Sequence, residues 1–307
     1  MAIVNTALPI TSQSCQEMIR QLVDTYSDMR TEVLGRTAFQ RPISSLVLGS
    51  GERQVLYSAA HHANEWITSL VLLKYAEDLA QAARDEGQIY NRSARELLER
   101  VTIHIVPMVD PDGVDLVVGA ISQEDVSYAL AQRISRDFPD IPFPEGWKAN
   151  LLGTDLNLNY PAGWLMAREI KFSQGYTQPA PRDYVGRAPI NQLETQILAA
   201  YTEEVNPDLV LAYHSQGKEI YWEFRNYQVP GAQELGEQMS QASGYVLAQA
   251  PYNSSFAGYK DWFIQNFRKP GYTIEVGQGE NPLPLSQFDE IYQDNLGILT
   301  IAALDGA

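Results

Sequence analysis

The amino-acid sequence predicts an α/β protein with a mostly parallel β-sheet that is covered by helices on both faces. Short apolar runs alternate along the chain with longer segments whose apolar residues recur at helical spacing, and this alternation is typical of parallel sheets with helical crossovers. The 307 residues contain no internal repeat, low-complexity tract or linker. We therefore expect one domain over residues 1–307, with a helical N-terminal region at 1–34 packed on it.

Local patterns place the individual elements along the chain. Ser14–Glu17 has the pattern of a capping box at the start of an amphipathic helix, and Gly49–Glu52 predicts a hairpin between two apolar runs. Asp110–Gly113 predicts a turn after the strand at 101–109. The stretch 136–190 is rich in Pro, Gly and aromatic residues and lacks periodicity, so we expect it to form a wall of a cleft. The other predicted elements are helices that begin near Trp66, Ser93, Asn191, Gly231 and Ser286, and strands at 44–48, 55–60, 208–213 and 271–276.

Composition argues against several functional classes. A net charge of −16 disfavours nucleic acid and anionic membranes as partners, because both require a basic surface. No run approaches the roughly 20 apolar residues that span a bilayer, and the N-terminus lacks the pattern of an export signal. The single cysteine, Cys15, rules out an internal disulfide and a cysteine-rich zinc site. We expect a soluble, cytoplasmic protein, whose oligomeric state the sequence leaves open.

Residue types that bind metal ions follow the ends of three predicted strands. His62 and Glu65 form an H-x-x-E motif after one strand, His214 follows a second strand, and Glu275 lies near the end of a third. Because the carboxyl ends of parallel strands line the same crevice, we expect these side chains to lie close together. Catalytic zinc typically takes three His, Asp or Glu ligands and leaves one position for water. His62, Glu65 and His214 are therefore the candidate ligands of one Zn²⁺ ion.

The same residue types also have ordinary structural interpretations. An H-x-x-E pair suits a polar helix start, where the helix dipole favours Glu65. Glu275 equally suits a strand-end carboxylate in an ion pair. Of the four histidines, His104 lies among Val and Ile residues, and we expect it to be a buried, hydrogen-bonded residue of the core.

A zinc ion at this place would suit the hydrolysis of a peptide or amide bond. Zn²⁺ polarises a substrate carbonyl and lowers the pKa of its water towards about 7. Glu275 would take the proton from that water and pass it to the leaving amine, as a general base that then acts as an acid. The sequence lacks the G-x-S-x-G, H-E-x-x-H, P-loop and G-x-G-x-x-G motifs of other enzyme classes.

The ordered set of motifs resembles the zinc carboxypeptidases of the pancreatic type, and within them a bacterial branch of γ-D-glutamyl-diamino acid peptidases. His62–Trp66 is similar to the family's H-x-x-E-W metal motif, and Tyr213–Ser215 to the segment with the third ligand. Thr273–Gly277 resembles the segment with the catalytic glutamate, and Gly153–Asn159 the G-V-D-x-N-R-N motif. The resemblance spans about residues 35–304 and implies an α/β/α sandwich around an eight-stranded mixed sheet.

At two site positions this sequence has the same residue type as the family motif. The resemblance implies that Asp155 accepts a hydrogen bond from the metal-bound His62, and so orients that ring. It also implies that Asn157 lines the substrate site. Tyr252 resembles a mobile tyrosine that covers the family's active site, although its spacing to Asp261 is one residue longer than in the family.

Three departures from the family pattern bear on the substrate. Leu158 replaces an arginine that clamps a terminal carboxylate, so ordinary carboxypeptidase action is not expected. Lys148 stands where pancreatic members have an arginine that steadies the oxyanion, and it can supply the same charge. Lys260 precedes Asp261, at the position that forms the floor of the specificity pocket. A basic floor favours the side-chain carboxylate of meso-diaminopimelate, whereas the alternative is a surface lysine that pairs with Asp261.

These features together predict a zinc peptidase that acts on peptidoglycan-derived peptides. The expected reaction is hydrolysis of the amide bond between γ-D-glutamate and meso-diaminopimelate. One alternative keeps the fold and the metal but changes the substrate, as in a carboxypeptidase or an amidase for other acyl-amino compounds. A second alternative is a catalytically silent binding module of the same fold.

Overall fold

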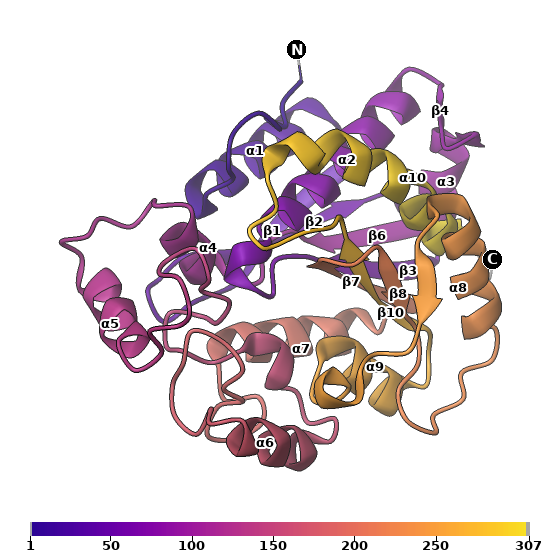
Figure 1. Ribbon diagram of the computed structural model, residues 1–307. Helices are drawn as coiled ribbons and strands as arrows, with labels where there is room; N and C mark the ends of the chain where they lie inside the picture. Colours follow the sequence, from indigo (N-terminus) through magenta and orange to yellow (C-terminus); the bar gives the residue numbers. More distant parts are fainter. Residues whose placement is uncertain (1, 305–307) are drawn as a thin grey trace.

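The computed structural model describes residues 2–304 and is built around an eight-stranded sheet (Figure 1). The strands lie in the order β1 (Met29–Arg36), β2 (Pro42–Leu48), β6 (Val101–Val106), β3 (Arg53–Ser58), β7 (Leu209–Ser215), β10 (Gly271–Val276), β8 (Glu219–Tyr221) and β9 (Val246–Ala248). The central strands β6, β3, β7 and β10 run parallel to one another. Antiparallel pairs join β1 to β2, β2 to β6 and β8 to β10, so the predicted mixed sheet is confirmed.

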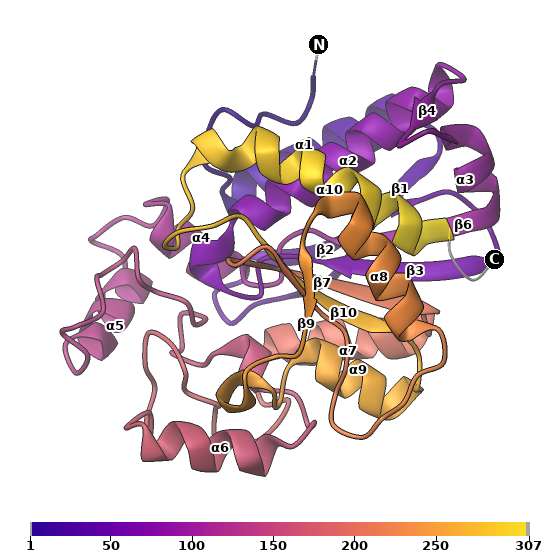
Figure 2. The same cartoon turned by 45° about the vertical axis from the view of Figure 1, so that its right-hand side comes forward.

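Helices cover both faces of this sheet (Figures 1 and 2). One face carries α1 (Ser12–Thr25), α2 (Ile67–Arg84), α3 (Ala94–Arg100), α8 (Ala232–Ser243) and α10 (Phe288–Leu304), and the other carries α6 (Trp164–Ser173), α7 (Leu193–Val205) and α9 (Tyr259–Phe267). Each face has its own apolar core, because side chains of a strand alternate between the faces. In β7, Leu211 and Tyr213 belong to the first core, whereas Val210 and Ala212 belong to the second.

Shorter elements complete the fold. They are α4 (Pro111–Val117), α5 (Val126–Ser135), the two-stranded sheet of β4 (Gln88–Ile89) and β5 (Arg92–Ser93), and the 3₁₀ helices η1 (Ala63–Glu65), η2 (Leu156–Leu158), η3 (Tyr252–Ser254) and η4 (Leu285–Gln287). The stretch 136–190 is mostly irregular, as predicted, but it contains α6, which the sequence analysis missed.

The predicted hairpin at Gly49–Glu52 is wrong. Strand β6 lies between β2 and β3, so the two strands that flank this loop are not neighbours. Instead, Gly51 allows the backbone of this loop to pass close to the backbone at the junction of α3 and β6. A Cβ atom at Gly51 would lie 1.8 Å from the carbonyl carbon of Arg100. The long crossover through α2 and α3 brings β6 alongside β3, as parallel pairing requires.

The predicted turn at Asp110–Gly113 is wrong, because a helix begins there, and the predicted start of the first helix also changes. The segment from Asp110 begins helix α4, with Pro111 in the first helical turn and a hydrogen bond of 3.0 Å from the backbone N–H of Gly113 to Asp110 Oδ1. Asp, Pro and Gly in this order suit a turn as well as a helix start, so the pattern alone does not separate them. Helix α1 is capped by Thr11, with Ser14 as the second member of the capping box, which places the helix start before the predicted one.

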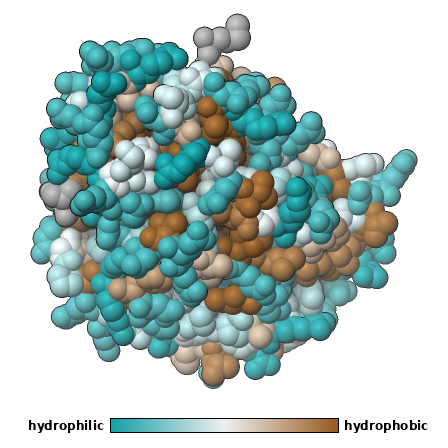
Figure 3. Space-filling view, turned by 180° about the vertical axis from the view of Figure 1, so that it is seen from behind, coloured by the Kyte–Doolittle hydropathy of each residue, from teal (hydrophilic) through white to brown (hydrophobic). Residues whose placement is uncertain are grey.

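The surface shows no dominant apolar face in the view from behind. That side is mostly hydrophilic, with apolar side chains in several separate groups (Figure 3). Large exposed apolar side chains such as Leu8, Val33, Val126, Leu165 and Val246 come from different parts of the chain. Among residues 2–304, no helix combines the length and apolar character needed to cross a bilayer.

The sheet order brings the candidate site residues to one edge. Strands β3, β7 and β10 are consecutive and parallel, so their carboxyl ends meet at the same crevice. Glu275 of β10 pairs in register with His214 of β7. The loop that follows β3 carries His62 and leads into η1 and α2.

Candidate metal centre and active site

Three buried side chains converge at the carboxyl end of the central strands. The Nδ1 atom of His214 lies 3.0 Å from His62 Nδ1 and 2.9 Å from Glu65 Oε2. The distance from His62 Nδ1 to Glu65 Oε1 is 3.0 Å. One ligand atom from each residue thus lies within 4.8 Å of the others, in a group that could hold a metal ion.

The loop after β3 is held in shape by a threonine. Thr68 Oγ1 accepts a hydrogen bond of 3.1 Å from the backbone N–H of Ala60 and donates one of 2.6 Å to the carbonyl of Glu65. This hydroxyl ties the start of the loop to the end of η1. The short 3₁₀ turn at Ala63–Glu65 then brings Glu65 back beside His62.

The geometry of this cluster fits Zn²⁺. Two ligands that lie about 2 Å from a tetrahedral ion are about 3.3 Å apart, close to the separations in this cluster. His62 Nε2 lies 3.0 Å from Asp155 Oδ1, and a proton on Nε2 leaves Nδ1 with a lone pair that faces His214. Two imidazole lone pairs and a carboxylate are donors that zinc prefers.

Asp155 is suited to hold the His62 ring. Burial raises the pKa of its carboxyl, but the charge of His62, the hydrogen bond from His62 and the charge of Lys148 lower it, and the net pKa lies below the ordinary value. Asp155 Oδ1 also accepts a hydrogen bond of 3.2 Å from the backbone N–H of Asn157. The carboxylate therefore stays ionised and fixed beside the ring.

Comparison with known proteins identifies the family. Residues 15–297 match the family described as zinc carboxypeptidase. The chain belongs to the zinc carboxypeptidase family. A protein of Lysinibacillus sphaericus named gamma-D-glutamyl-L-diamino acid endopeptidase 1 is 40% identical over 283 residues, which make up 91% of this chain and 68% of that protein. The metal of this family is Zn²⁺, in agreement with the donor set described above.

Several solved structures have the same fold as this chain. Carboxypeptidase A from Helicoverpa armigera matches with a TM-score of 0.71 at 15% identity, over 99% of this chain and 76% of that chain. The murein-tripeptide amidase of Escherichia coli O157 matches with a TM-score of 0.53 at 20% identity, over 88% of this chain and 91% of that chain. These likenesses support the fold alone.

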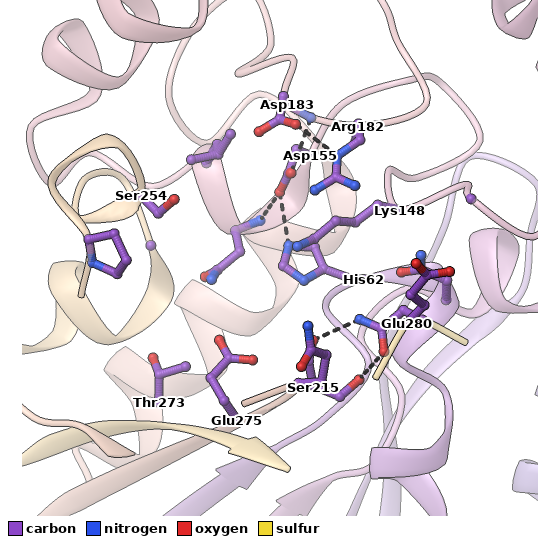
Figure 4. A pocket seen from close by; sticks show the side chains of 18 of the residues that line it. His62, Lys148, Asp155, Arg182, Asp183, Ser215, Ser254, Thr273, Glu275 and Glu280 are labelled. Atoms are coloured by element: carbon purple, nitrogen blue, oxygen red, sulfur yellow. Dashed lines mark hydrogen bonds and ion pairs between the residues drawn. The ribbon is translucent and has the colours of Figure 1, made fainter. Parts of the chain in front are cut away.

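Glu275 and Lys148 line a cavity that borders the candidate metal-binding cluster at His62. The cavity has a volume of about 730 Å³, and Figure 4 shows both side chains near His62. Lys148 Nζ lies 3.3 Å from Glu65 Oε1. Burial and the negative charge of Glu65 raise the pKa of the Glu275 carboxyl to about 8. A cation beside this carboxyl would favour its ionised form, so metal and base are electrostatically coupled.

The other predicted substrate residues fall into two groups. Asn157, Leu158 and Lys260 line the cavity. Lys260 is buried, donates a hydrogen bond of 2.6 Å to the carbonyl of Glu223 and lies 2.6 Å from Asp261 Oδ1. Tyr252 is 64% exposed on η3 and is not part of the cavity wall. Its role as a cover of the site stays a prediction.

The two remaining histidines lie outside the cluster. His104 is buried, and its ring nitrogens lie 2.7 Å from the hydroxyl of Tyr201 and 2.8 Å from Gln54 Oε1, which confirms the predicted core histidine. His61 is fully buried and stacks on His214 with ring centroids 5.4 Å apart.

The stretch 136–190 contributes to the cavity wall, as predicted, but sequence reasoning did not single out its charged residues Lys171, Arg182 and Asp183. These residues come from the stretch 136–190, where no periodicity or motif distinguishes them. Their link to the site is a tertiary contact: the backbone N–H of Asp183 donates a hydrogen bond of 3.3 Å to Asp155 Oδ2.

Proposed function

We propose that this member of the zinc carboxypeptidase family hydrolyses the amide bond between the γ-carboxyl of D-glutamate and the amine of a diamino acid, with meso-diaminopimelate as the preferred diamino acid, in peptidoglycan-derived peptides. The observation that carries the proposal is a cavity that combines the candidate zinc cluster with Glu275 and a buried lysine, Lys260. The relative from Lysinibacillus sphaericus, which is named for this bond, supports the choice of substrate.

In this proposal His62, Glu65 and His214 hold the metal, and Asp155 fixes the His62 ring through its 3.0 Å contact. Zinc bound there would polarise the scissile carbonyl and lower the pKa of a water molecule towards about 7. Glu275 accepts the proton of the attacking water at its carboxylate and returns it to the leaving amine. Lys148 places a positive charge beside the position where the carbonyl oxygen becomes negative.

The presence of Leu158 argues against conventional carboxypeptidase activity. Its side chain lines the cavity but offers no hydrogen-bond donor to a terminal carboxylate. Binding of the leaving group then depends on other cations in the wall. We propose that Lys260, which lines the cavity, binds the distal carboxylate of diaminopimelate through the N–H group that remains beside its bond to the Glu223 carbonyl and its ion pair with Asp261.

Lys260→Met is expected to reduce kcat/KM about 10- to 100-fold for peptides with diaminopimelate, because a charge-assisted hydrogen bond is lost. Analogues with lysine in place of diaminopimelate lack the distal carboxylate, and their rates should change little. The measurement is a comparison of initial rates for matched pairs of peptides. Lys74→Met, on α2, is the control. Equal losses on both kinds of peptide would count against the assignment of Lys260.

The proposed reaction is tested directly by mass spectrometry of muropeptide digests. Zinc-loaded protein should release a product that ends in D-glutamate together with a peptide that begins with diaminopimelate, and chelation of the metal should abolish both. Release of a single C-terminal amino acid would favour the carboxypeptidase alternative. The absence of bound metal and of any product would favour a silent binding module.

A further inference from the structure

Arg182 lies in the wall of the cavity next to the candidate zinc site. It belongs to the loop between α6 and α7, and Figure 4 shows its guanidinium on the same side of His62 as Lys148. Lys148 and Arg182 both line this part of the cavity beside Asp155. This side of the cavity therefore carries two positive groups.

One edge of the Arg182 guanidinium is fixed by a neighbour. Its Nε atom donates a hydrogen bond of 2.9 Å to Asp183 Oδ2. Lys171 pairs with the other carboxylate oxygen of Asp183 at 2.5 Å, and the backbone of Asp183 is bound to Asp155. The guanidinium is thus held in place, while the charge of Asp183 is already compensated by Lys171.

The other edge of the guanidinium is available to a ligand. Within residues 2–304 neither Nη atom of Arg182 has a hydrogen-bond acceptor, and the side chain is 43% exposed. A planar guanidinium offers two parallel N–H groups that match the two oxygens of a carboxylate. Such a half-satisfied, anchored arginine is a preformed carboxylate site.

The same cavity has a further basic residue in its lining, Lys260. In Figure 4, Lys148 and Arg182 are on one side of His62, and Ser254 and Thr273 are on the other. Lys260 donates a hydrogen bond to the carbonyl of Glu223, two residues after Tyr221, which pairs in register with Thr273. A substrate in this cavity would meet more than one cation.

We infer that Arg182 binds the free α-carboxylate of the γ-linked glutamyl residue on the acyl side of the scissile bond, and thereby selects γ-linked over ordinary peptide bonds. This inference rests on the proposed function. A glutamyl residue joined through its γ-carboxyl keeps an ionised α-carboxylate, whereas an α-linked residue carries a neutral amide at that place. Arg182 distinguishes the two by charge and by its paired N–H groups.

The test compares two peptides that differ in one group. Both contain D-glutamate linked through its γ-carboxyl to diaminopimelate, and the α-carboxyl is free in one and a carboxamide in the other. The wild type should prefer the free carboxylate by about 10- to 100-fold in kcat/KM. Arg182→Gln should lose this preference, mainly through a higher KM for the carboxylate peptide, and should hydrolyse the carboxamide peptide at the wild-type rate. Arg187→Gln, an exposed neighbour in the same loop, should behave as wild type.

Each other outcome contradicts the inference in a recognisable way. An equal loss on both peptides in Arg182→Gln would assign Arg182 a structural role at Asp183. Equal rates of the wild type on both peptides would leave the proposed function intact and overturn the role of Arg182. If the wild type cleaves neither peptide, the proposed function itself fails. Arg182→Lys keeps the charge without the paired N–H groups, and should recover only part of the preference.

Discussion

Replacing Glu275 by glutamine is expected to reduce kcat about 10²- to 10⁴-fold, the usual contribution of a general acid–base group, while zinc binding is preserved. Glutamine has nearly the same shape but cannot accept and return a proton. Glu275 lies in register with His214, at the end of the neighbouring strand, and borders the same cavity as His62. Steady-state kinetics on a diaminopimelate peptide, with metal content measured on the same sample, provide the check.

A second cavity carboxylate serves as the matched control for Glu275. Glu280 lines the cavity but is exposed to solvent, so Glu280→Gln should leave kcat within a fewfold of the wild type. Similar losses in the two variants would show that the rate follows the total negative charge of the cavity. Full activity in Glu275→Gln would remove the carboxylate from the mechanism altogether.

Loss of bound zinc is the expected result for His62→Gln. The affinity for zinc should fall by more than the roughly 10- to 100-fold that follows the loss of an outer hydrogen-bond partner of a ligand. The variant also leaves the buried carboxylate of Asp155 without its imidazole partner and removes one of the two imidazoles beside Glu65, so its thermal stability should drop as well. Chelator competition and thermal unfolding measure the two effects.

The neighbouring histidine offers a sharp comparison with His62. His61 is equally buried but does not belong to the metal-binding group, so His61→Gln should retain stoichiometric zinc. His104→Gln, on a distant strand, reports the effect of losing any buried histidine. Retention of zinc by His62→Gln together with its loss in His61→Gln would show that the ligand set is misassigned.

The proximity of the candidate ligands could be predicted from two independent features of the sequence, namely the spacing of a short motif and the position of residues at strand ends. His62 and Glu65 lie in one short motif, whose spacing a single 3₁₀ turn converts into proximity. His214 and Glu275 follow apolar strands, and the carboxyl ends of parallel strands share one crevice. Neither feature depends on knowing the strand order in full.

Other features of the site lay outside the reach of sequence patterns. Arg182 and Lys171 come from an irregular stretch whose path is set by distant contacts, such as the bond from Asp183 to Asp155. Lys260 could be assigned to the floor of a pocket only through a family resemblance. Its burial beside Asp261 and the Glu223 carbonyl became visible in the packed structure.

By itself, the sequence determined the α/β class, the type of most elements and the residues that gather at the candidate zinc site, because periodicity and strand-end position are local properties of the chain. The tertiary structure alone decided the strand order, with β6 between β2 and β3, and which side chains of the stretch 136–190 form the charged wall beside the cluster. The physical reason is the same in both cases. Loops such as Gly49–Glu52 and 174–190 carry no repeating pattern, so their course depends on close contacts with backbone that is far away in the sequence.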